Sequence, residues 1–222
     1  MAGKRTYGDV CGVARALDAV GERWALMIVR ELLLGPKRFT DLRAGLPHLS
    51  PDILTQRLRD LDAGGIVTRR TLPPPAPAKL YELTALGHEL EPVVTALGRW
   101  GALLPISDGE LHMSFDAHIL SLRTLFAPAL AEGFAAHVQL RLGEQRFLAV
   151  VEDGGLVIEP GETAAPDAVI ATDASTLIAL VHGRRELDDA LRAGDVTLAG
   201  DEAVVRRFLG LFPLPEPIAA AT

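Results

Sequence analysis

The sequence of 222 residues has one cysteine, 5% aromatic residues and no apolar run of the roughly 20 residues that cross a bilayer. A single cysteine excludes an intrachain disulfide and is typical of proteins from a reducing compartment. The first residues lack the apolar stretch of a secretory signal. We therefore expect a cytoplasmic protein with no membrane partner, and the scarcity of aromatic residues predicts a mostly aliphatic core.

Motifs of the common enzyme classes are also missing. The sequence has no Gly-x-Ser-x-Gly nucleophile elbow, no Walker loop and no Cys-x-x-Cys pair, so we expect no enzyme, no catalytic residue and no cofactor. His112 and Asp116 are four residues apart, but no further strong ligand is nearby, which favours a helix surface over a metal site. His182 directly precedes Gly183 and is interpreted as a cation at a helix C-terminus.

The net charge of −7 argues, as an average, against a polyanionic partner. The average hides two unlike halves, because residues 1–104 carry 14 basic and 11 acidic side chains while residues 105–222 carry 8 and 18. Such an asymmetry hints at a nucleic-acid-binding part joined to an acidic partner, which we expect to point away from the polyanion. A Pro/Gly/Ser/Asp cluster at 104–109 marks the joint. We expect domains over 1–106 and 107–213, and a flexible tail over 214–222.

Apolar periodicity in the first half predicts helices over 10–20, 24–34, 40–45 (capped by Thr40), 51–63 and 84–104. Ser50 as N-cap and Pro51 as first helical residue mark a helix start. Two β-rich stretches, 66–71 and 79–84, flank a proline-rich segment and predict a hairpin. This order of elements predicts a winged helix-turn-helix, whose second paired helix enters the major groove of DNA.

The helix over 51–63 turns Leu54, Leu58 and Leu61 inward, which leaves polar side chains on its other faces. Gln and Arg suit base edges, and Ser, Thr and Arg suit phosphates. The candidate DNA-binding residues are Ser50, Thr55, Gln56, Arg57 and Arg59 on this helix, and Arg69, Arg70 and Lys79 on the hairpin. The alternative is that Arg59, Arg69 and Arg70 are ordinary solvated surface.

Residues 11–101 resemble the HxlR-type family of bacterial winged-helix regulators. The resemblance lies in CGVARAL (11–17), GERWALMIVREL (21–32), RFTDL (38–42), LSPDILTQRLRDL (49–61), GIV (65–67) and YELTALG (81–87). It implies a homodimer, formed largely through the first helix and the helix over 84–104, on a pseudo-palindromic operator in double-stranded DNA. The sequence departs from the family at the wing tip, where PPPAPA (73–78) replaces a charged or polar stretch.

Cys11 has two interpretations. It opens the first helix, where the helix dipole lowers the pKa of a thiol, and some relatives sense oxidants through a cysteine at this place, so Cys11 is a candidate redox sensor. The alternative is a small buried residue that packs against the dimer mate.

The second half predicts an α+β module. Helical patterns cover 115–125, 173–181, 187–192 and 200–211, and strand patterns cover 135–142, 147–151, 156–158, 168–172 and 196–198, with an Asp-Gly turn at 152–155. Residues 114–212 resemble the sterol-carrier-protein type 2-like fold through PDAVIATD (166–173), LIALVHGR (177–184), ALRAGDVTLAGD (190–201) and RFLGLF (207–212). The resemblance implies an apolar ligand cavity. Its candidate lining residues are Ile119, Phe126, Leu177, Leu180, Phe208 and Phe212, which are alternatively ordinary core.

Taken together, the sequence predicts an α+β chain with a winged helix-turn-helix followed by a sterol-carrier-like domain. The expected function is a dimeric, nucleoid-associated transcriptional repressor whose C-terminal domain either binds a controlling apolar small molecule or strengthens the dimer. Two alternatives stay open. One is a lipid-like ligand carrier whose helix-turn-helix serves only dimerisation, and the other is a regulator switched by the Cys11 thiol.

Overall fold

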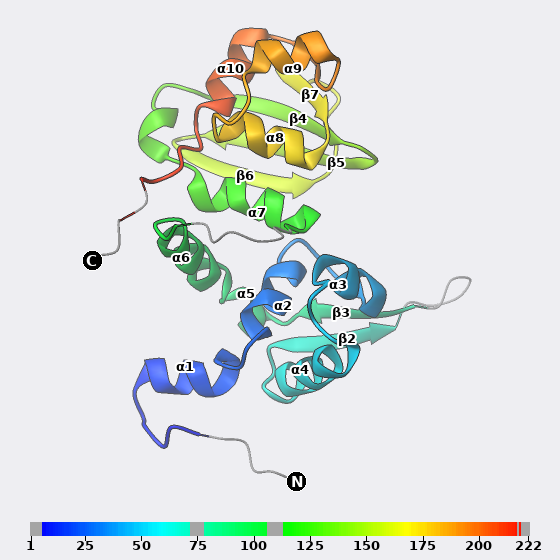
Figure 1. The fold of residues 1–222 in the computed structure, drawn as a ribbon, viewed down its shortest axis with the longest axis vertical. Coiled ribbons are helices and arrows are strands. Elements are labelled where there is room, and N and C mark those ends of the chain that lie inside the picture. Colours follow the sequence, from blue (N-terminus) through cyan, green and yellow to red (C-terminus); the bar gives the residue numbers. More distant parts are fainter. Residues whose placement is uncertain (1–5, 72–77, 106–112, 217, 219–222) are drawn as a thin grey trace. The chain divides into compact units, whose positions relative to one another are not determined.

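A computed structural model describes residues 6–71, 78–105, 113–216 and 218. The chain divides into two units, Met1–Val94 and Thr95–Thr222, and the division falls inside helix α6 (Glu91–Gly101). Figure 1 labels the helices α1–α10 and the strands β2–β7 of the two units. The expected joint after residue 106, most of the wing tip, His112 and the end of the tail lie outside the described residues. Within the described part of the chain, no helix is both long and apolar enough to span a membrane.

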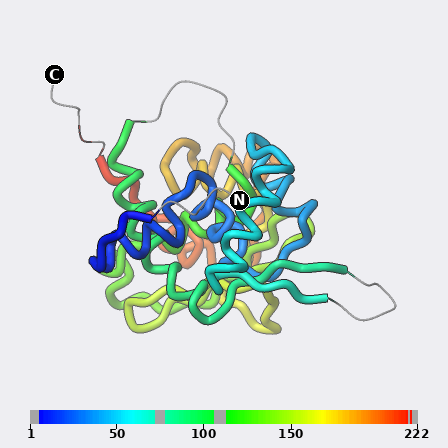
Figure 2. Tube along the Cα trace, turned by 90° about the horizontal axis from the view of Figure 1, so that it is seen from below, coloured from blue at the N-terminus to red at the C-terminus, as the bar shows by residue number. Residues whose placement is uncertain are grey.

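The N-terminal unit has the predicted order of a helix-turn-helix followed by a two-stranded ribbon. Its elements are α1 (Gly12–Val20), α2 (Ala25–Leu32), β1 (Lys37–Arg38), α3 (Phe39–Gly45), α4 (Pro51–Ala63), β2 (Val67–Thr71), β3 (Lys79–Leu83), α5 (Ala85–His88) and the start of α6. Strand β3 lies between β1 and β2 and is antiparallel to both. Figure 2 shows β2 and β3 side by side as an extended ribbon. The two-residue strand β1 was not predicted.

Helix starts in this unit follow the capping chemistry of the sequence, with one correction. Ser50 Oγ accepts a hydrogen bond from the Ile53 N–H at 3.4 Å, and Pro51 is the first helical residue of α4, as predicted. The expected cap of α3 at Thr40 is wrong, because the helix begins at Phe39. There the Asp41 carboxylate accepts a hydrogen bond from the Arg38 N–H at 2.9 Å.

The helix expected over 84–104 is broken. Helix α5 ends at His88 and α6 begins at Glu91. Pro92 explains the break, because proline has no N–H to donate to the carbonyl oxygen of His88, and its ring would clash with that carbonyl in a continuous helix. The predicted helical region is therefore two helices rather than one.

The core of the N-terminal unit is aliphatic, as the composition predicts. Side chains at 0–1% exposure come from three helices and one strand: Ile28, Val29 and Leu32 from α2, Leu42 from α3, Leu54, Leu58 and Leu61 from α4, and Val67 from β2. The three leucines of α4 form the stripe predicted from their spacing. Their burial fixes which face of α4 is left for other contacts.

The C-terminal unit is an α+β module with a mixed five-stranded sheet in the order β6-β5-β4-β7-β8. Its elements are α7 (Phe115–Leu125), a 3₁₀ turn (Pro128–Ala131), β4 (Ala136–Leu142), β5 (Gln145–Glu152), β6 (Gly155–Pro160), β7 (Ala168–Thr172), α8 (Ala174–Val181), α9 (Leu187–Ala193), β8 (Thr197–Gly200) and α10 (Glu202–Leu209). Only β4 and β7 pair in parallel. The predicted elements are all present, with boundaries shifted by a few residues.

The turn and the sheet of this unit follow from the sequence pattern. Asp153 and Gly154 have φ of 51° and 71°, the two positive values of a type I′ hairpin turn, which confirms the predicted Asp-Gly turn between β5 and β6. Alternate residues of the central strands, including Val138, Leu140 and Ala149, are fully buried. Helix α7 contacts β6, and α10 contacts β4 and β7, so helices cover this buried face.

Candidate nucleic-acid interface

Helix α4 presents one polar face because its leucine stripe is anchored in the core. Leu46 and Leu49, in the turn between α3 and α4, are also buried, at 3% and 4% exposure, which fixes the approach of the chain to α4. The opposite face of the helix is exposed and carries Gln56 and Arg59. This is the arrangement in which the second helix of a helix-turn-helix offers its side chains to the major groove.

Arg59 and Gln56 are the two α4 side chains best placed for contacts outside the chain. Arg59 is exposed and has no hydrogen-bond or ion-pair partner among the described residues. Gln56 donates from Nε2 to Asp60 Oδ1 at 2.8 Å. This bond uses one amide hydrogen, so a second hydrogen and the carbonyl oxygen Oε1 remain for a base edge. Their contact with DNA stays a prediction.

The two hydroxyl candidates on α4 make hydrogen bonds within their own helix. Ser50 Oγ caps the N-terminus, and Thr55 Oγ1 donates to the carbonyl oxygen of Pro51 at 2.8 Å. Ser50 is exposed and Thr55 is half-buried. Ser50 lies at the N-terminal end of α4, where backbone N–H groups favour phosphate, so its predicted contact remains compatible with the geometry.

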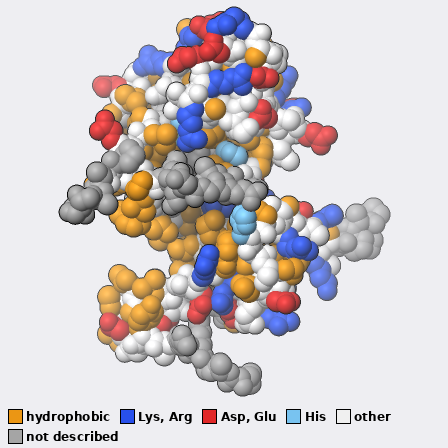
Figure 3. All heavy atoms as spheres, in the orientation of Figure 1, with side chains coloured by type: hydrophobic (Ala, Val, Ile, Leu, Met, Phe, Trp, Pro, Cys, Tyr) orange, Lys and Arg blue, Asp and Glu red, His pale blue; other side chains and the backbone are white. Residues whose placement is uncertain are grey.

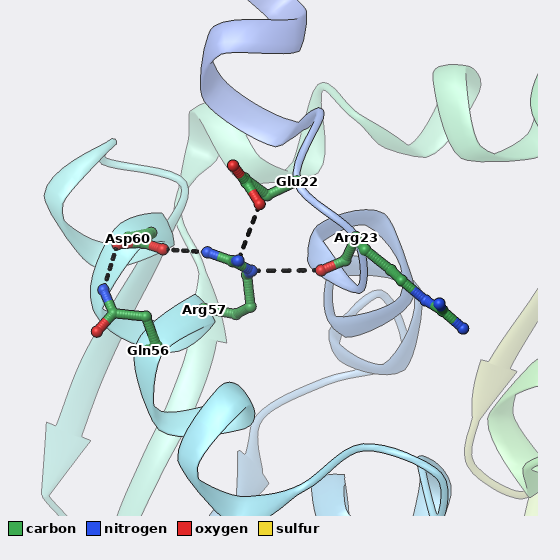
Figure 4. A network of polar contacts seen from close by, with 5 residues as sticks. All are labelled: Glu22, Arg23, Gln56, Arg57 and Asp60. Atoms are coloured by element: carbon green, nitrogen blue, oxygen red, sulfur yellow. Dashed lines mark hydrogen bonds and ion pairs between the residues drawn. The ribbon is translucent and has the colours of Figure 1, made fainter. Parts of the chain in front are cut away.

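Arg57 differs from Arg59 although both lie on α4. Its side chain is only 19% exposed and is held by two carboxylates, those of Glu22 and Asp60, and by the carbonyl oxygen of Arg23. Figure 4 shows the guanidinium between these three partners, turned toward the segment that precedes α2. Arg57 is therefore already satisfied by protein groups, which sequence reasoning did not find.

The wing places two of its three basic candidates on the side of α4. In the β2–β3 register, Arg69 is opposite Tyr81 and Thr71 is opposite Lys79, so Arg69 and Lys79 share one face of the ribbon. Arg69 Nε lies 3.4 Å from Asp62 Oδ2 on α4, which identifies that face as the one turned toward the helix. In Figure 3, Lys and Arg side chains gather beside the outer ends of these strands.

Arg70 lies on the other face of the same ribbon. It is opposite Leu80 in the register, and its Nε is 3.3 Å from Glu82 Oε2. The sequence analysis named Arg69, Arg70 and Lys79 together as candidate DNA-binding residues of the hairpin. The register separates them, because neighbouring residues of a strand point to opposite faces.

Two helices of the described part of the chain carry exposed apolar side chains. On α1 and just before it, Val10, Val13 and Leu17 are 92%, 68% and 43% exposed. No described residue of α6 is buried, and Val93, Leu97, Trp100 and Leu104 form a stripe at helical spacing with 48–59% exposure. Hydrophobic side chains cover α1 in Figure 3. Exposed apolar side chains that cluster on one helix face are candidates for a protein interface.

Cys11 is exposed at the N-cap of α1, and its N–H donates to Asp9 Oδ1 at 2.9 Å. Within this chain it is therefore not a buried residue. The alternative of burial against a dimer mate requires a second chain, and the role as redox sensor stays a prediction.

The six apolar residues expected to line a ligand cavity are buried at 0–8% exposure: Ile119, Phe126, Leu177, Leu180, Phe208 and Phe212. The Phe212 ring centroid lies 5.2 Å from that of Phe208 and 6.1 Å from that of Phe126, as in a packed core. This packing favours the alternative interpretation for these phenylalanines. Leu180 also lines an open surface hollow of about 310 Å³, whose wall includes the charged side chains Arg185, Glu186 and Arg206.

Two polar groups of this unit differ from expectation. Burial, and next the positive charge of Arg184, lower the pKa of His182, which disfavours the charged form that a helix-terminal cation requires. Asp116 is 8% exposed on α7 and is not a surface residue. Among the described residues no three potential ligands gather into a metal site.

Two family models match different parts of the chain. The model "HxlR-like helix-turn-helix" matches residues 19–105, which include α2 to α6. The model "Alkyl sulfatase C-terminal" matches residues 120–218. The second match describes the C-terminal unit differently from the expected sterol-carrier-like fold. The comparisons do not support that expectation, which stays a prediction.

The similar proteins follow the same division. The HTH-type transcriptional regulator sll1512 of Synechocystis sp. is 36% identical over 95 residues, which are 43% of this chain and 70% of that protein. The HTH-type transcriptional regulator YvaP of Bacillus subtilis is 36% identical over 86 residues, 39% of this chain and 80% of that protein. Both proteins are described as uncharacterized.

Two solved structures are similar to parts of the chain. The redox regulator HypR in its oxidized form has 34% identity and a TM-score of 0.40, covering 44% of this chain and all of that one. The sec-alkylsulfatase Pisa1 from Pseudomonas sp. has 21% identity and a TM-score of 0.42, covering 48% of this chain and 17% of that one. Both TM-scores are low, so the family assignment rests on the sequence matches and not on these structures.

Proposed function

Because the chain belongs to the family of HxlR-like helix-turn-helix transcriptional regulators, we propose that it binds double-stranded DNA as a homodimer with α4 of each protomer in the major groove. The observation that carries the proposal is the exposed face of α4, where Arg59 has no partner among the described residues and Gln56 keeps a free donor and acceptor. Arg and Gln are the side chains that pair bidentately with guanine and adenine.

The wing supplies the contacts that hold this helix in register. Arg69 and Lys79 lie on the α4 side of the ribbon, where both are exposed. Contacts of such side chains with phosphates position a protein on DNA without reading the base sequence. The excess of basic over acidic side chains in residues 1–104 supports the same assignment.

The exposed apolar faces of α1 and α6 support the dimer. Each carries three or more large side chains that a single chain leaves in water. A two-fold symmetric dimer would bury them and present two copies of α4 to a pseudo-palindromic operator. Repression follows if the operator overlaps a promoter, and an apolar molecule held by the C-terminal unit is the proposed effector.

Selection from a random duplex library tests the proposal. The full chain should enrich a two-fold symmetric sequence, and its affinity should fall steeply with salt, with a slope of about −0.9 per phosphate contacted. Arg59→Ala should weaken binding to the selected duplex by about 1–3 kcal/mol, since it removes a base or phosphate contact.

Arg192→Ala is the matched control, because Arg192 is exposed on α9 in the C-terminal unit and should leave the affinity unchanged. Failure to enrich any sequence, together with shallow salt dependence, would contradict the proposal. That result would favour the alternative of a ligand carrier whose helix-turn-helix serves only dimerisation.

A further inference from the structure

Arg57 is the centre of a polar network that joins α4 to the turn before α2 (Figure 4). Its Nη1 donates to Asp60 Oδ2 at 2.6 Å, its Nη2 to Glu22 Oε2 at 2.9 Å, and its Nε to the carbonyl oxygen of Arg23 at 3.3 Å. Hydrogen bonds between charged groups are stronger and more directional than those between neutral ones. The three partners therefore hold the guanidinium in one orientation.

One end of the network is a turn with a constrained backbone. Glu22 and Arg23 connect α1 to α2, and the next residue, Trp24, has φ of 78°. This left-handed conformation is uncommon for a bulky side chain. The Arg23 guanidinium lies 5.3 Å from the centroid of the Trp24 ring, a further contact that defines the turn. Arg57 thus fastens α4 to the segment that leads from α1.

The other end of the network is the side chain best suited to read a base. Asp60 accepts hydrogen bonds from both Arg57 and Gln56, the latter at 2.8 Å from Nε2 to Oδ1. The remaining Nε2 hydrogen and Oε1 of Gln56 match the N7 acceptor and N6 donor of adenine. The orientation of this amide depends on Asp60, and that of Asp60 depends on Arg57.

Electrostatics separate Arg57 from the arginines that suit phosphate. Two carboxylates surround its single guanidinium, so the cluster as a whole is not cationic. A phosphate that approached it would meet Glu22, which is 62% exposed, as well as Arg57, which is 19% exposed. Arg59 has no such carboxylate partner among the described residues.

From these contacts we infer that Arg57 is a positioning residue. It fixes the angle of α4 against the α1–α2 turn and, through Asp60, the amide of Gln56, and it does not touch DNA. The inference rests on the proposed function, since it concerns how the same surface reads its operator. It also gives a route by which a displacement of α1 reaches the reading surface, because Glu22 follows α1 directly.

Glu22→Gln gives the sharpest test, because the two roles of Arg57 predict opposite signs. If Arg57 bound phosphate, removal of its competing carboxylate would strengthen binding. As a positioning residue, Arg57 loses an anchor, so affinity for the selected duplex should fall several-fold while affinity for a scrambled duplex stays constant. Tighter binding by Glu22→Gln would overturn the inference. The substitution is at an exposed side chain, so folding should be preserved.

Arg57→Gln and Arg59→Gln form a pair with the same change of charge. Loss of a phosphate contact reduces the magnitude of the slope of log affinity against log salt by about one. If Arg57 only positions α4, Arg57→Gln should keep the wild-type slope and discriminate less between the selected and the scrambled duplex. Arg57→Lys should resemble Arg57→Gln, because lysine keeps the charge but lacks the planar fork. A lowered slope for Arg57→Gln, or wild-type specificity for Arg57→Lys, would contradict the inference.

The design separates failure of the inference from failure of the proposed function. If wild-type chain binds the selected duplex and Arg59→Gln weakens it, the function stands, and the Glu22 and Arg57 variants alone decide the positioning role. If the wild-type chain selects no duplex, the proposed function and the positioning role of Arg57 are both contradicted. Circular dichroism and the elution volume of each variant establish that it is folded and has the wild-type oligomeric state.

Discussion

Arg69 and Arg70 are adjacent in the sequence, yet they occupy different environments. Arg69 shares its face of the wing with Lys79 and approaches Asp62 of α4, whereas Arg70 pairs with Glu82 on the other face. Exposed ion pairs of this kind contribute only about 0–1 kcal/mol, so either arginine can exchange its partner for a phosphate. We therefore propose that position on the ribbon, rather than exposure, decides which arginine contributes to DNA binding.

The wing predicts a difference between two charge-matched variants. Arg69→Gln should weaken DNA binding and lower the salt slope by about one, because it removes a contact on the α4 side. Arg70→Gln should have a clearly smaller effect. Fluorescence anisotropy of a labelled duplex at several salt concentrations measures both. Equal losses for the two variants, or a larger loss for Arg70→Gln, would show that the face of the ribbon does not matter.

At the residue scale, sequence identified the leucine stripe of α4 and its capping but could not rank the arginines. Leu54, Leu58 and Leu61 follow from local periodicity. The role of Arg57 depends on Glu22, 35 residues away, and no local pattern signals a contact of that range. A carboxylate three residues after an arginine, as Asp60 is, was the one available hint of an intramolecular pair.

Among the elements, α1 and α6 are distinguished by apolar side chains that their own chain leaves exposed. Val13 on α1 is 68% exposed and Trp100 on α6 is 59% exposed. Such exposure lowers the solubility of an isolated chain. Burial against a second copy would stabilise the pair by about 25 cal/mol per Å² of apolar surface removed from water. These faces make α1 and α6 the dimerisation elements of the proposed function.

A charge placed in this surface should separate the protomers. Val13→Glu is expected to shift the chain from dimer to monomer in light scattering after size exclusion, since the carboxylate would be buried without a partner. Arg15→Gln makes the same change of charge on an exposed position on the other side of α1 and should remain dimeric. A Val13→Glu chain that stays dimeric at micromolar concentration would exclude α1 from the interface.

Element boundaries were predictable where local signals are strong. Helices α4 and α7 and strand β7 lie where periodicity and capping place them, and Asp153-Gly154 forms the expected turn. The break between α5 and α6 was missed because apolar spacing continues across it, although Pro92 was visible in the sequence. Strand β1 has two residues and exists through pairing with β3, which no local pattern reveals.

At the scale of the whole molecule, the net charge of the part proposed to bind DNA differs in sign from that of the rest of the chain. Residues 1–104 carry the basic excess and include α4 and the wing, while residues 105–222 carry the acidic excess. The net value of −7 is therefore no measure of the surface that meets DNA. Sequence could not separate the two interpretations of the six apolar residues named as cavity lining, because apolar core and apolar pocket have the same composition, and their burial favours the core.

The most direct test of the central claim, that α4 reads DNA in the major groove, is a scan of 7-deazapurines across one half-site. This replacement removes the N7 acceptor of a single purine and leaves base pairing intact. Wild-type chain should lose about 1–3 kcal/mol of binding free energy at one or two positions. The loss should disappear in Gln56→Ala or Arg59→Ala, and 3-deazaadenine, which alters the minor groove, should have no effect at those positions. A scan in which no 7-deazapurine weakens binding, or in which both variants keep the wild-type losses, would contradict the account.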